Sequence, residues 1–99
     1  VHFRNVRGRV PHYVETFVDE GDVDMTEIVR ILRDADYDGV LVPDHVPDLH
    51  APSPWHSGSA YTIGYMRALI RNADSLGPSR SATGPQVEVI SDAAVAAAN

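Results

Sequence analysis

Apolar residues recur at helical spacing after Asp24: Met25, Ile28, Val29, Leu32 and Ala35. Steps of three and four residues predict a helix with one apolar face. Asp24 is placed to cap the first turn, with Glu27 three residues later, as in a capping box. On the other face we expect an ion pair between Arg30 and Asp34. Gly39 is expected to stop the helix.

Short strand-like segments flank this helix. Residues 1–6 (VHFRNV) are typical of the end of a strand, and residues 40–42 form a continuous apolar run between Gly39 and Pro43. Because the run does not alternate, it predicts a strand buried on both faces, as in a parallel sheet. Strand, helix and strand in this order predict a βαβ unit with a right-handed crossover. Residues 7–21, interrupted by glycine and proline, are expected to form a loop.

A second helix is predicted over residues 60–73, after a loop over residues 46–59. Its apolar positions are Ile63, Met66, Leu69 and Ile70, with Tyr65 on the flank. Gly64 weakens this helix by about 1 kcal/mol relative to alanine. Residues 74–99 are expected to form a flexible tail, in which residues 92–98 are compatible with a short helix. Two strands and two helices cannot close a sheet, so residues 1–73 are interpreted as a βαβα part, about a quarter, of a (β/α)₈ TIM barrel.

The composition narrows the chemistry. The chain has 99 residues and a formal charge of -6, which argues against nucleic-acid or anionic-membrane partners. All eight basic residues are arginine, so Schiff-base chemistry is excluded here, and the lack of cysteine excludes a thiolate nucleophile. No apolar run is long enough to cross a bilayer. The chain starts at Val1 without methionine, as an excised fragment does, and we expect a soluble, cytoplasmic setting.

Three residues whose side chains can bind a metal or transfer a proton lie at the predicted strand ends. His2 ends the first strand, and Asp44 and His45 follow the second. In TIM barrels the active site gathers at the C-terminal ends of strands. Carboxylate and imidazole together suit Mn²⁺, Fe²⁺ or Zn²⁺. Spacing alone also allows a structural histidine at His2, a turn residue at Asp44 and an exposed side chain at His45.

Three blocks resemble the mannonate dehydratase family. They are HFRNVR at residues 2–7, DEGDVDM at residues 19–25 and PDHVP at residues 43–47. Their order and separation match the family over roughly residues 1–72. The resemblance implies a C-terminal fragment of a TIM barrel of the xylose-isomerase-like type. It also implies a lyase of hexuronate (glucuronate) catabolism that converts D-mannonate to 2-keto-3-deoxy-D-gluconate and water with Mn²⁺ or Fe²⁺.

The resemblance also assigns residue roles. It implies metal ligation by His2 and Asp44, acid–base catalysis by His45 and a tyrosine, and contact with the substrate carboxylate by Arg4 and Asn5. Tyr61 is the candidate tyrosine, and Tyr65 is the alternative. The family's other metal ligands, a histidine and a cysteine, come from earlier strands, so the isolated chain is expected to bind metal weakly and to be inactive. The parent protein is expected to be a homo-oligomer that takes a small sugar acid.

Two other interpretations remain open. A metal-dependent sugar isomerase or epimerase of the same barrel type also uses carboxylate and histidine ligands at strand ends. Alternatively, the chain is a non-catalytic barrel fragment whose exposed apolar faces bind a partner. Trp55 is either a wall over the sugar acid or a packing residue at the barrel rim. His12, His50 and His56 lie in loop-like sequence and are expected to be solvated.

Overall fold

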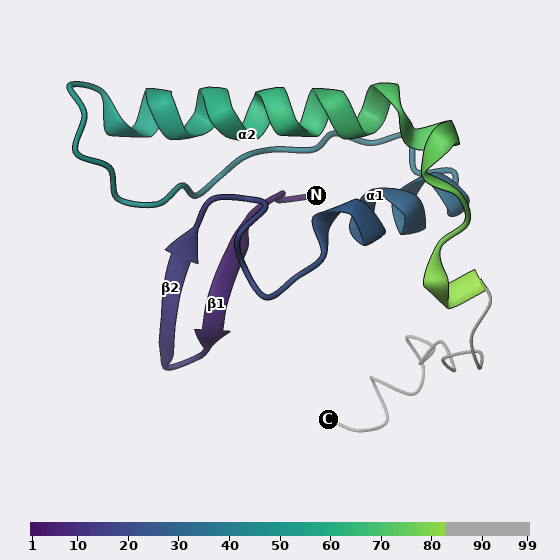
Figure 1. Ribbon diagram of the computed structural model, residues 1–99, viewed down its shortest axis with the longest axis horizontal. Coiled ribbons are helices and arrows are strands. Elements are labelled where there is room, and N and C mark those ends of the chain that lie inside the picture. Colours follow the sequence, from purple (N-terminus) through teal and green to yellow (C-terminus); the bar gives the residue numbers. More distant parts are fainter. Residues whose placement is uncertain (83–99) are drawn as a thin grey trace.

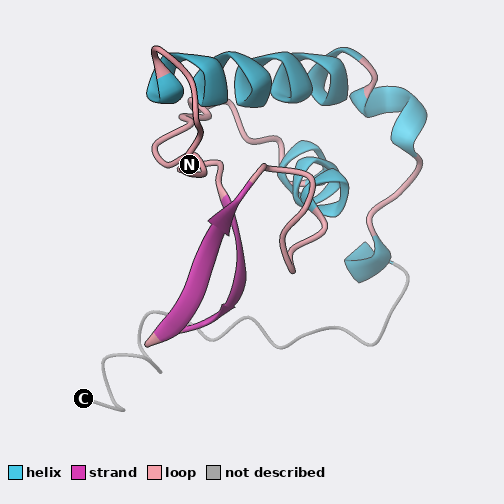
Figure 2. Cartoon of the chain, turned by 60° about the vertical axis from the view of Figure 1, so that its left-hand side comes forward, coloured by secondary structure: helices cyan, strands magenta, loops and turns pink. Residues whose placement is uncertain are grey.

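The computed structural model describes residues 1–82 (Figure 1). Its elements are β1 (Asn5–Arg9), β2 (His12–Thr16), α1 (Met25–Asp34), α2 (Pro54–Arg71) and two short 3-10 helices, η1 (Ala73–Leu76) and η2 (Arg80–Ala82). Helix α2 runs along one side of the molecule, α1 lies beneath its C-terminal half, and the β1–β2 hairpin projects away from both (Figures 1 and 2). The expected helix over residues 92–98 lies outside the described residues.

The β1–β2 hairpin replaces the loop predicted for residues 7–21. The strands pair antiparallel, with Asn5 opposite Thr16 and Arg9 opposite His12. The turn between them contains Val10 and Pro11. The prediction was wrong because Pro11 was taken to break the segment, whereas a proline in the turn leaves the ladder of hydrogen bonds intact.

Helix α1 begins as predicted. Asp24 is its N-cap, and the carboxylate Oδ1 accepts a hydrogen bond from the backbone N–H of Glu27 at 3.1 Å. The predicted stop at Gly39 is wrong, because the helix ends at Asp34. Asp36 has a positive φ of 50°, and its N–H donates to the carbonyl of Arg33. The N–H of Tyr37 donates to the carbonyl of Leu32, which completes a Schellman motif with aspartate in the left-handed position.

Gly39 has a different role from the one predicted. A Cβ atom at this position would lie 2.2 Å from the hydroxyl oxygen of Tyr37. That hydroxyl donates to the carbonyl of Val40 at 3.1 Å. The glycine therefore allows the chain to pass closely over the tyrosine as it leaves α1.

The N-terminal segment pairs in parallel with residues 40–42, as the βαβ interpretation requires. His2 and Val42 form a parallel bridge, and the N–H of Phe3 donates to the carbonyl of Val42 at 2.8 Å. The pairing is an isolated bridge rather than a full strand. The prediction of a strand buried on both faces is wrong for this chain, because Val40 is 71% exposed and no described strand covers its outer side.

Helix α2 is longer than predicted, because it starts at Pro54 rather than at residue 60. Proline suits the first helical turn, where its missing N–H costs no hydrogen bond. The buried face of α2 includes Thr62 and Met66, whereas Ile63 and Ile70 of the predicted apolar stripe are exposed. No helix in residues 1–82 is long and apolar enough to cross a membrane.

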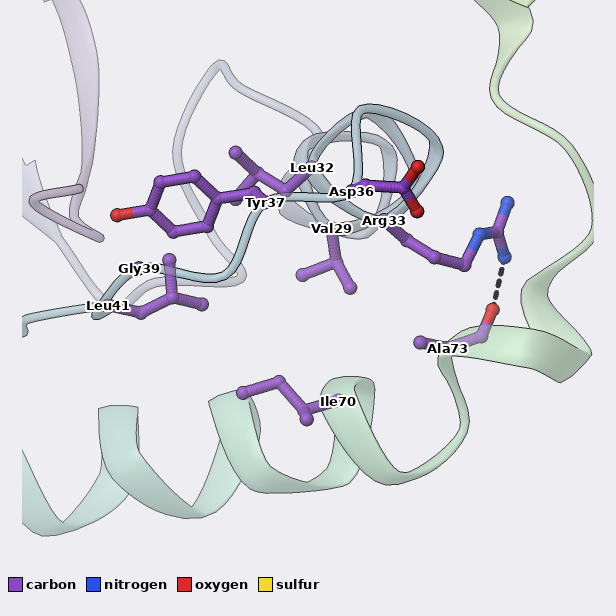
Figure 3. Close-up of a pocket in the computed structure, with 9 residues that line it drawn as sticks. All are labelled: Val29, Leu32, Arg33, Asp36, Tyr37, Gly39, Leu41, Ile70 and Ala73. Carbon is purple, nitrogen blue, oxygen red and sulfur yellow. Dashed lines mark hydrogen bonds between the residues drawn. The ribbon is translucent and has the colours of Figure 1, made fainter.

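The core lies where α1 and α2 meet the parallel bridge. Its buried members are Phe3, Val18, Met25, Val29 and Met66. An apolar groove of about 460 Å³ opens beside it, between α1, the chain after it and the end of α2 (Figure 3). Val29, Leu32, Leu41 and Ile70 line this groove.

Residues 73–82 pack against α1 and rearrange its ion pairs. The predicted Arg30–Asp34 pair is wrong: Arg30 pairs with Glu27 at 3.3 Å, and its Nε donates to the carbonyl of Leu76 at 2.8 Å. Asp34 instead pairs with Arg33 and accepts the backbone N–H of Ser79. The segment predicted as a tail from residue 74 is thus held to α1 as far as η2.

In fold class the described residues form a small mixed α/β unit with a two-stranded sheet and two helices. The parallel bridge across α1 is compatible with part of a larger α/β fold. The described residues contain no closed barrel.

Candidate functional site

The parallel bridge brings together two of the residues predicted to form a site. The Nδ1 atom of His2 lies 3.0 Å from Oδ2 of Asp44. His2 precedes Phe3, which is paired to Val42, and Asp44 follows Val42 by two residues. The Asp44 side chain is mostly buried and the His2 side chain is mostly exposed. The chain thus places a carboxylate and an imidazole side by side at the ends of two paired segments.

His45 joins this cluster from the other side of Asp44. Its Nε2 atom is 3.6 Å from Oδ2 of Asp44, and its Nδ1 atom is 3.9 Å from Oε1 of Glu15. Glu15 also forms an ion pair with the guanidinium of Arg4. Four site residues predicted from the sequence, His2, Arg4, Asp44 and His45, are therefore linked in one network, with Glu15 as its fifth member.

Two carboxylate oxygens in this network are buried without a hydrogen-bond partner: Oδ1 of Asp44 and Oε2 of Glu15. A buried carboxylate oxygen without a donor is costly, so these atoms mark a place where a donor or a cation would be stabilised. Asp44 and His2 offer oxygen and nitrogen atoms that a transition-metal ion accepts. Within residues 1–82, no group of three or more histidine, cysteine, aspartate or glutamate side chains is close enough to hold a metal.

Asn5 serves the hairpin rather than an open surface. Its Nδ2 group donates to the carbonyls of Val18 and Val23 at 2.9 and 2.7 Å. Its Oδ1 accepts the N–H groups of Val6 and Val23. Because both amide hydrogens and both lone pairs are used, Asn5 has no free group to offer a substrate in this structure. It fixes the loop between β2 and α1 instead.

Tyr61 lies on α2 and contacts the same loop. Its hydroxyl donates to the carboxylate of Asp19 at 2.8 Å, and its ring packs on Phe17 with centroids 4.6 Å apart. This hydrogen bond to Asp19 raises the pKa of the Tyr61 hydroxyl above its ordinary value of 10.0, and partial burial adds to the effect. Within residues 1–82, Tyr61 forms no hydrogen bond with Asp44 or His45. Tyr65 packs partly buried against the core.

A shallow hollow of about 410 Å³ adjoins Glu15. Its lining combines β2 with the start of α2: Val14, Glu15, Val46, Pro47, Asp48, Pro54 and Trp55. Trp55 is more than half exposed and meets the ring of His56 edge-on at 5.6 Å. An aromatic ring at the edge of a shallow hollow is compatible with the role of a wall over a sugar acid. His12, His50 and His56 are exposed, as predicted, although His12 lies on β2 and His56 on α2 rather than in loops.

Glu15 is the residue that sequence reasoning missed. The register places Val6 opposite Glu15, and Arg4 precedes Val6 by two residues on the same face of the chain. Opposite charges at diagonal positions of an antiparallel pair are within reach of each other. Interpreting residues 5–16 as a hairpin would have predicted the Arg4–Glu15 pair. That interpretation was not made, because Pro11 was taken to interrupt the segment.

Site residues at the ends of parallel-paired segments, next to a helical crossover, are typical of α/β enzymes that assemble their chemistry from several strand ends. Residues 1–76 match the sequence profile of the D-mannonate dehydratase (UxuA) family. The chain therefore belongs to the D-mannonate dehydratase family, a family of lyases of carbohydrate catabolism. Searches of curated proteins and of solved structures gave no match.

Proposed function

We propose that this chain is part of a metal-dependent D-mannonate dehydratase that converts D-mannonate to 2-keto-3-deoxy-D-gluconate and water. The observation that carries the proposal is the pairing of His2 with Asp44, next to His45, in a member of this family. His2 and the adjacent residues Asp44 and His45 come from two separate segments, and the parallel bridge brings these segments together.

His2 and Asp44 would hold the metal, Mn²⁺ or Fe²⁺. The fit is supported by the buried Oδ1 of Asp44, which lacks a hydrogen-bond partner and is the kind of oxygen that a cation would stabilise. A bound divalent ion would supply Lewis-acid stabilisation of the negative charge that develops on the substrate carboxylate. His2 already contacts Asp44, so one of these two side chains has to rotate to admit the ion.

The reaction removes a proton from the carbon next to the carboxylate and expels the neighbouring hydroxyl as water. His45 is suited to proton exchange, because an imidazole can both accept and donate a proton and its ring is half exposed. Arg4 is suited to binding the substrate carboxylate through its planar guanidinium. Tyr61 remains a proposed catalytic residue, with Tyr65 as the alternative; the Asp19 contact of Tyr61 would have to open for that role.

Two protein ligands do not make a tight divalent site. We therefore expect this chain alone to bind Mn²⁺ weakly, and we propose that further ligands come from other strands of the complete enzyme. In support, Val40 and Val42 are exposed beside the parallel bridge, where a neighbouring strand would cover them. The same exposure favours the second candidate function, that of a non-catalytic fragment that binds a partner through this face.

The test is keto-acid formation from D-mannonate with added Mn²⁺, measured for this chain and for a complete barrel enzyme that contains it. We expect turnover by the complete enzyme and none by the chain. If the complete enzyme binds Mn²⁺ but forms no keto acid, the dehydratase proposal is wrong, and ketose and aldose sugars are the next substrates to assay for isomerase activity. A compact chain with protected backbone amides at residues 40–42 would remove the support for partner binding.

A further inference from the structure

Glu15 occupies the position between two proposed site residues. Its Oε1 atom forms the ion pair with Arg4 and also lies 3.9 Å from Nδ1 of His45. Arg4 belongs to the N-terminal segment, Glu15 to β2 and His45 to the loop before α2. The hairpin therefore brings into the site a carboxylate that belongs to none of the three family sequence blocks.

The surroundings of Glu15 indicate more than a surface ion pair. Its side chain is 21% exposed, and its second oxygen, Oε2, is buried without a partner. An ion pair that served only to stabilise the hairpin would not need to bury an unpaired oxygen, because that burial works against folding. The carboxylate is thus held by Arg4 through Oε1 and keeps unused acceptor capacity at Oε2.

His45 needs such a partner. Its ring is 54% exposed, and its two nitrogens face Asp44 and Glu15. Asp44 is already paired with His2 at 3.0 Å, so it is less able to orient His45. Glu15 is therefore the described carboxylate best placed to fix the ring through Nδ1.

We propose that Glu15 is a positioning residue: its carboxylate, held by Arg4, orients the imidazole of His45 by accepting a hydrogen bond from Nδ1. A carboxylate on one ring nitrogen selects the tautomer with the proton on that nitrogen and leaves the other nitrogen for proton exchange. A hydrogen bond of this kind is about 2.9 Å long, so Glu15 and His45 approach by about 1 Å from their separation of 3.9 Å when it forms. The catalytic part of this inference rests on the proposed dehydratase function.

The first test needs no activity. The imidazole nitrogens of the ¹⁵N-histidine-labelled chain are recorded at pH 8, with His45→Gln to assign the His45 signals. We expect Glu15→Ala to move the His45 signals toward the tautomer mixture of free histidine, while the signals of His12 and His50 stay in place. Glu20→Ala, which removes an exposed carboxylate from the next loop, is the matched control and should change none of them. Unchanged His45 signals in a folded Glu15→Ala chain would overturn the proposal.

If Glu15→Ala does not fold, the isosteric Glu15→Gln replaces it. Glutamine keeps the volume but loses the charge that favours a proton on Nδ1, so the signals should move in the same direction. Far-UV circular dichroism verifies that the variant is folded before the imidazole signals are compared. A folded Glu15→Gln chain with wild-type His45 signals is equally decisive against the proposal.

The second test uses the complete enzyme with D-mannonate and Mn²⁺. Glu15→Gln should lower kcat by about 10- to 100-fold with the bound metal unchanged, as loss of an orienting partner does. Glu15→Asp, which restores the charge, should recover part of the rate. An unchanged kcat in Glu15→Gln would contradict the positioning role. Wild-type enzyme that makes no keto acid would refute the dehydratase function alone, since the imidazole signals still report on Glu15.

Discussion

His2 and Asp44 lie within hydrogen-bond distance, 3.0 Å between Nδ1 and Oδ2, although helix α1 and the whole β1–β2 hairpin separate them in the sequence. The contact exists because residues 2 and 42 pair in parallel, and it places the two proposed metal ligands next to each other. The proposed roles of the residues in this cluster can be tested by replacing them one at a time.

Replacing Asp44 should remove the metal. In the complete enzyme Asp44→Asn keeps the volume of the side chain but loses the charge that attracts a divalent ion, so we expect dehydration of D-mannonate to fall by more than about 100-fold. Bound Mn²⁺, measured by elemental analysis after dialysis, should fall in parallel. Asp38→Asn, at an exposed position six residues earlier, is the control. Wild-type turnover by Asp44→Asn at saturating Mn²⁺ would remove Asp44 from the ligand set.

Replacing His45 should separate rate from metal binding. His45→Asn removes the proposed proton-exchange group but leaves His2 and Asp44 in contact, so kcat should fall by about 10²- to 10⁴-fold. The Mn²⁺ content should stay at the wild-type level, which is the pattern of an acid–base residue rather than a ligand. Loss of the metal from this variant would show that His45 is itself a ligand.

The sequence predicted α1 and its cap correctly because the helix is determined locally, by apolar spacing and by the Asp24 carboxylate over the first turn. It also predicted which segments pair in parallel around the helix. The end of α1 was missed because an aspartate, Asp36, takes the left-handed position that usually indicates glycine. The Arg30–Asp34 pair failed because residues 73–82 bring competing groups, a tertiary effect that helical spacing does not contain.

The candidate site also contains residues whose placement the sequence predicts and one, Asn5, whose placement it does not. His2, Asp44 and His45 follow from their positions at strand ends, and the structure brings them together. Asn5 was grouped with them because the family resemblance implies that it contacts the substrate carboxylate, but its amide is used up by the loop that leads to α1. Whether a polar residue faces a ligand or a backbone depends on where a later loop returns, and neighbouring residues in the sequence do not carry that information.

Asn5 should therefore matter for stability. Asn5→Ala leaves the carbonyls of Val18 and Val23 without their donors in a buried place, so we expect the free energy of unfolding to fall by about 2–3 kcal/mol. Urea denaturation followed by circular dichroism measures the change. Asn72→Ala is a matched control, because Asn72 is exposed and its amide donates to only one carbonyl, that of Ala68. Equal losses in the two variants would contradict the structural role of Asn5.

The Asp19–Tyr61 hydrogen bond should be visible in an alkaline titration. Because Asp19 accepts from the neutral phenol, the pKa of Tyr61 is raised above the ordinary value of 10.0. The bond therefore adds stability below the pKa of Tyr61 in the unfolded chain, and this stability is lost as the pH rises through the folded value. Asp19→Asn should bring the pKa back toward its ordinary value.

Ultraviolet absorbance of ionised tyrosine follows this titration. Tyr61→Phe identifies the contribution of Tyr61 by difference from the other three tyrosines. If the Tyr61 signal titrates at the same pH with and without Asp19, the hydrogen bond does not control its ionisation. A role for Tyr61 in proton transfer would then be easier to accept, since its hydroxyl would be free for a substrate.

The parallel bridge between His2 and Val42 also has a kinetic consequence. Arg4 and Glu15 meet through a tight hairpin turn, and hairpins form in about 1–10 μs. His2 and Asp44 meet only after a loop of roughly 40 residues has closed, at an entropic cost of roughly 3 kcal/mol. During refolding, the carboxylate that we assign to orienting His45 is therefore expected to be in place before the proposed metal-binding pair forms. A divalent ion bound at that pair would stabilise the folded chain, because separating the two paired segments would require the ion to dissociate.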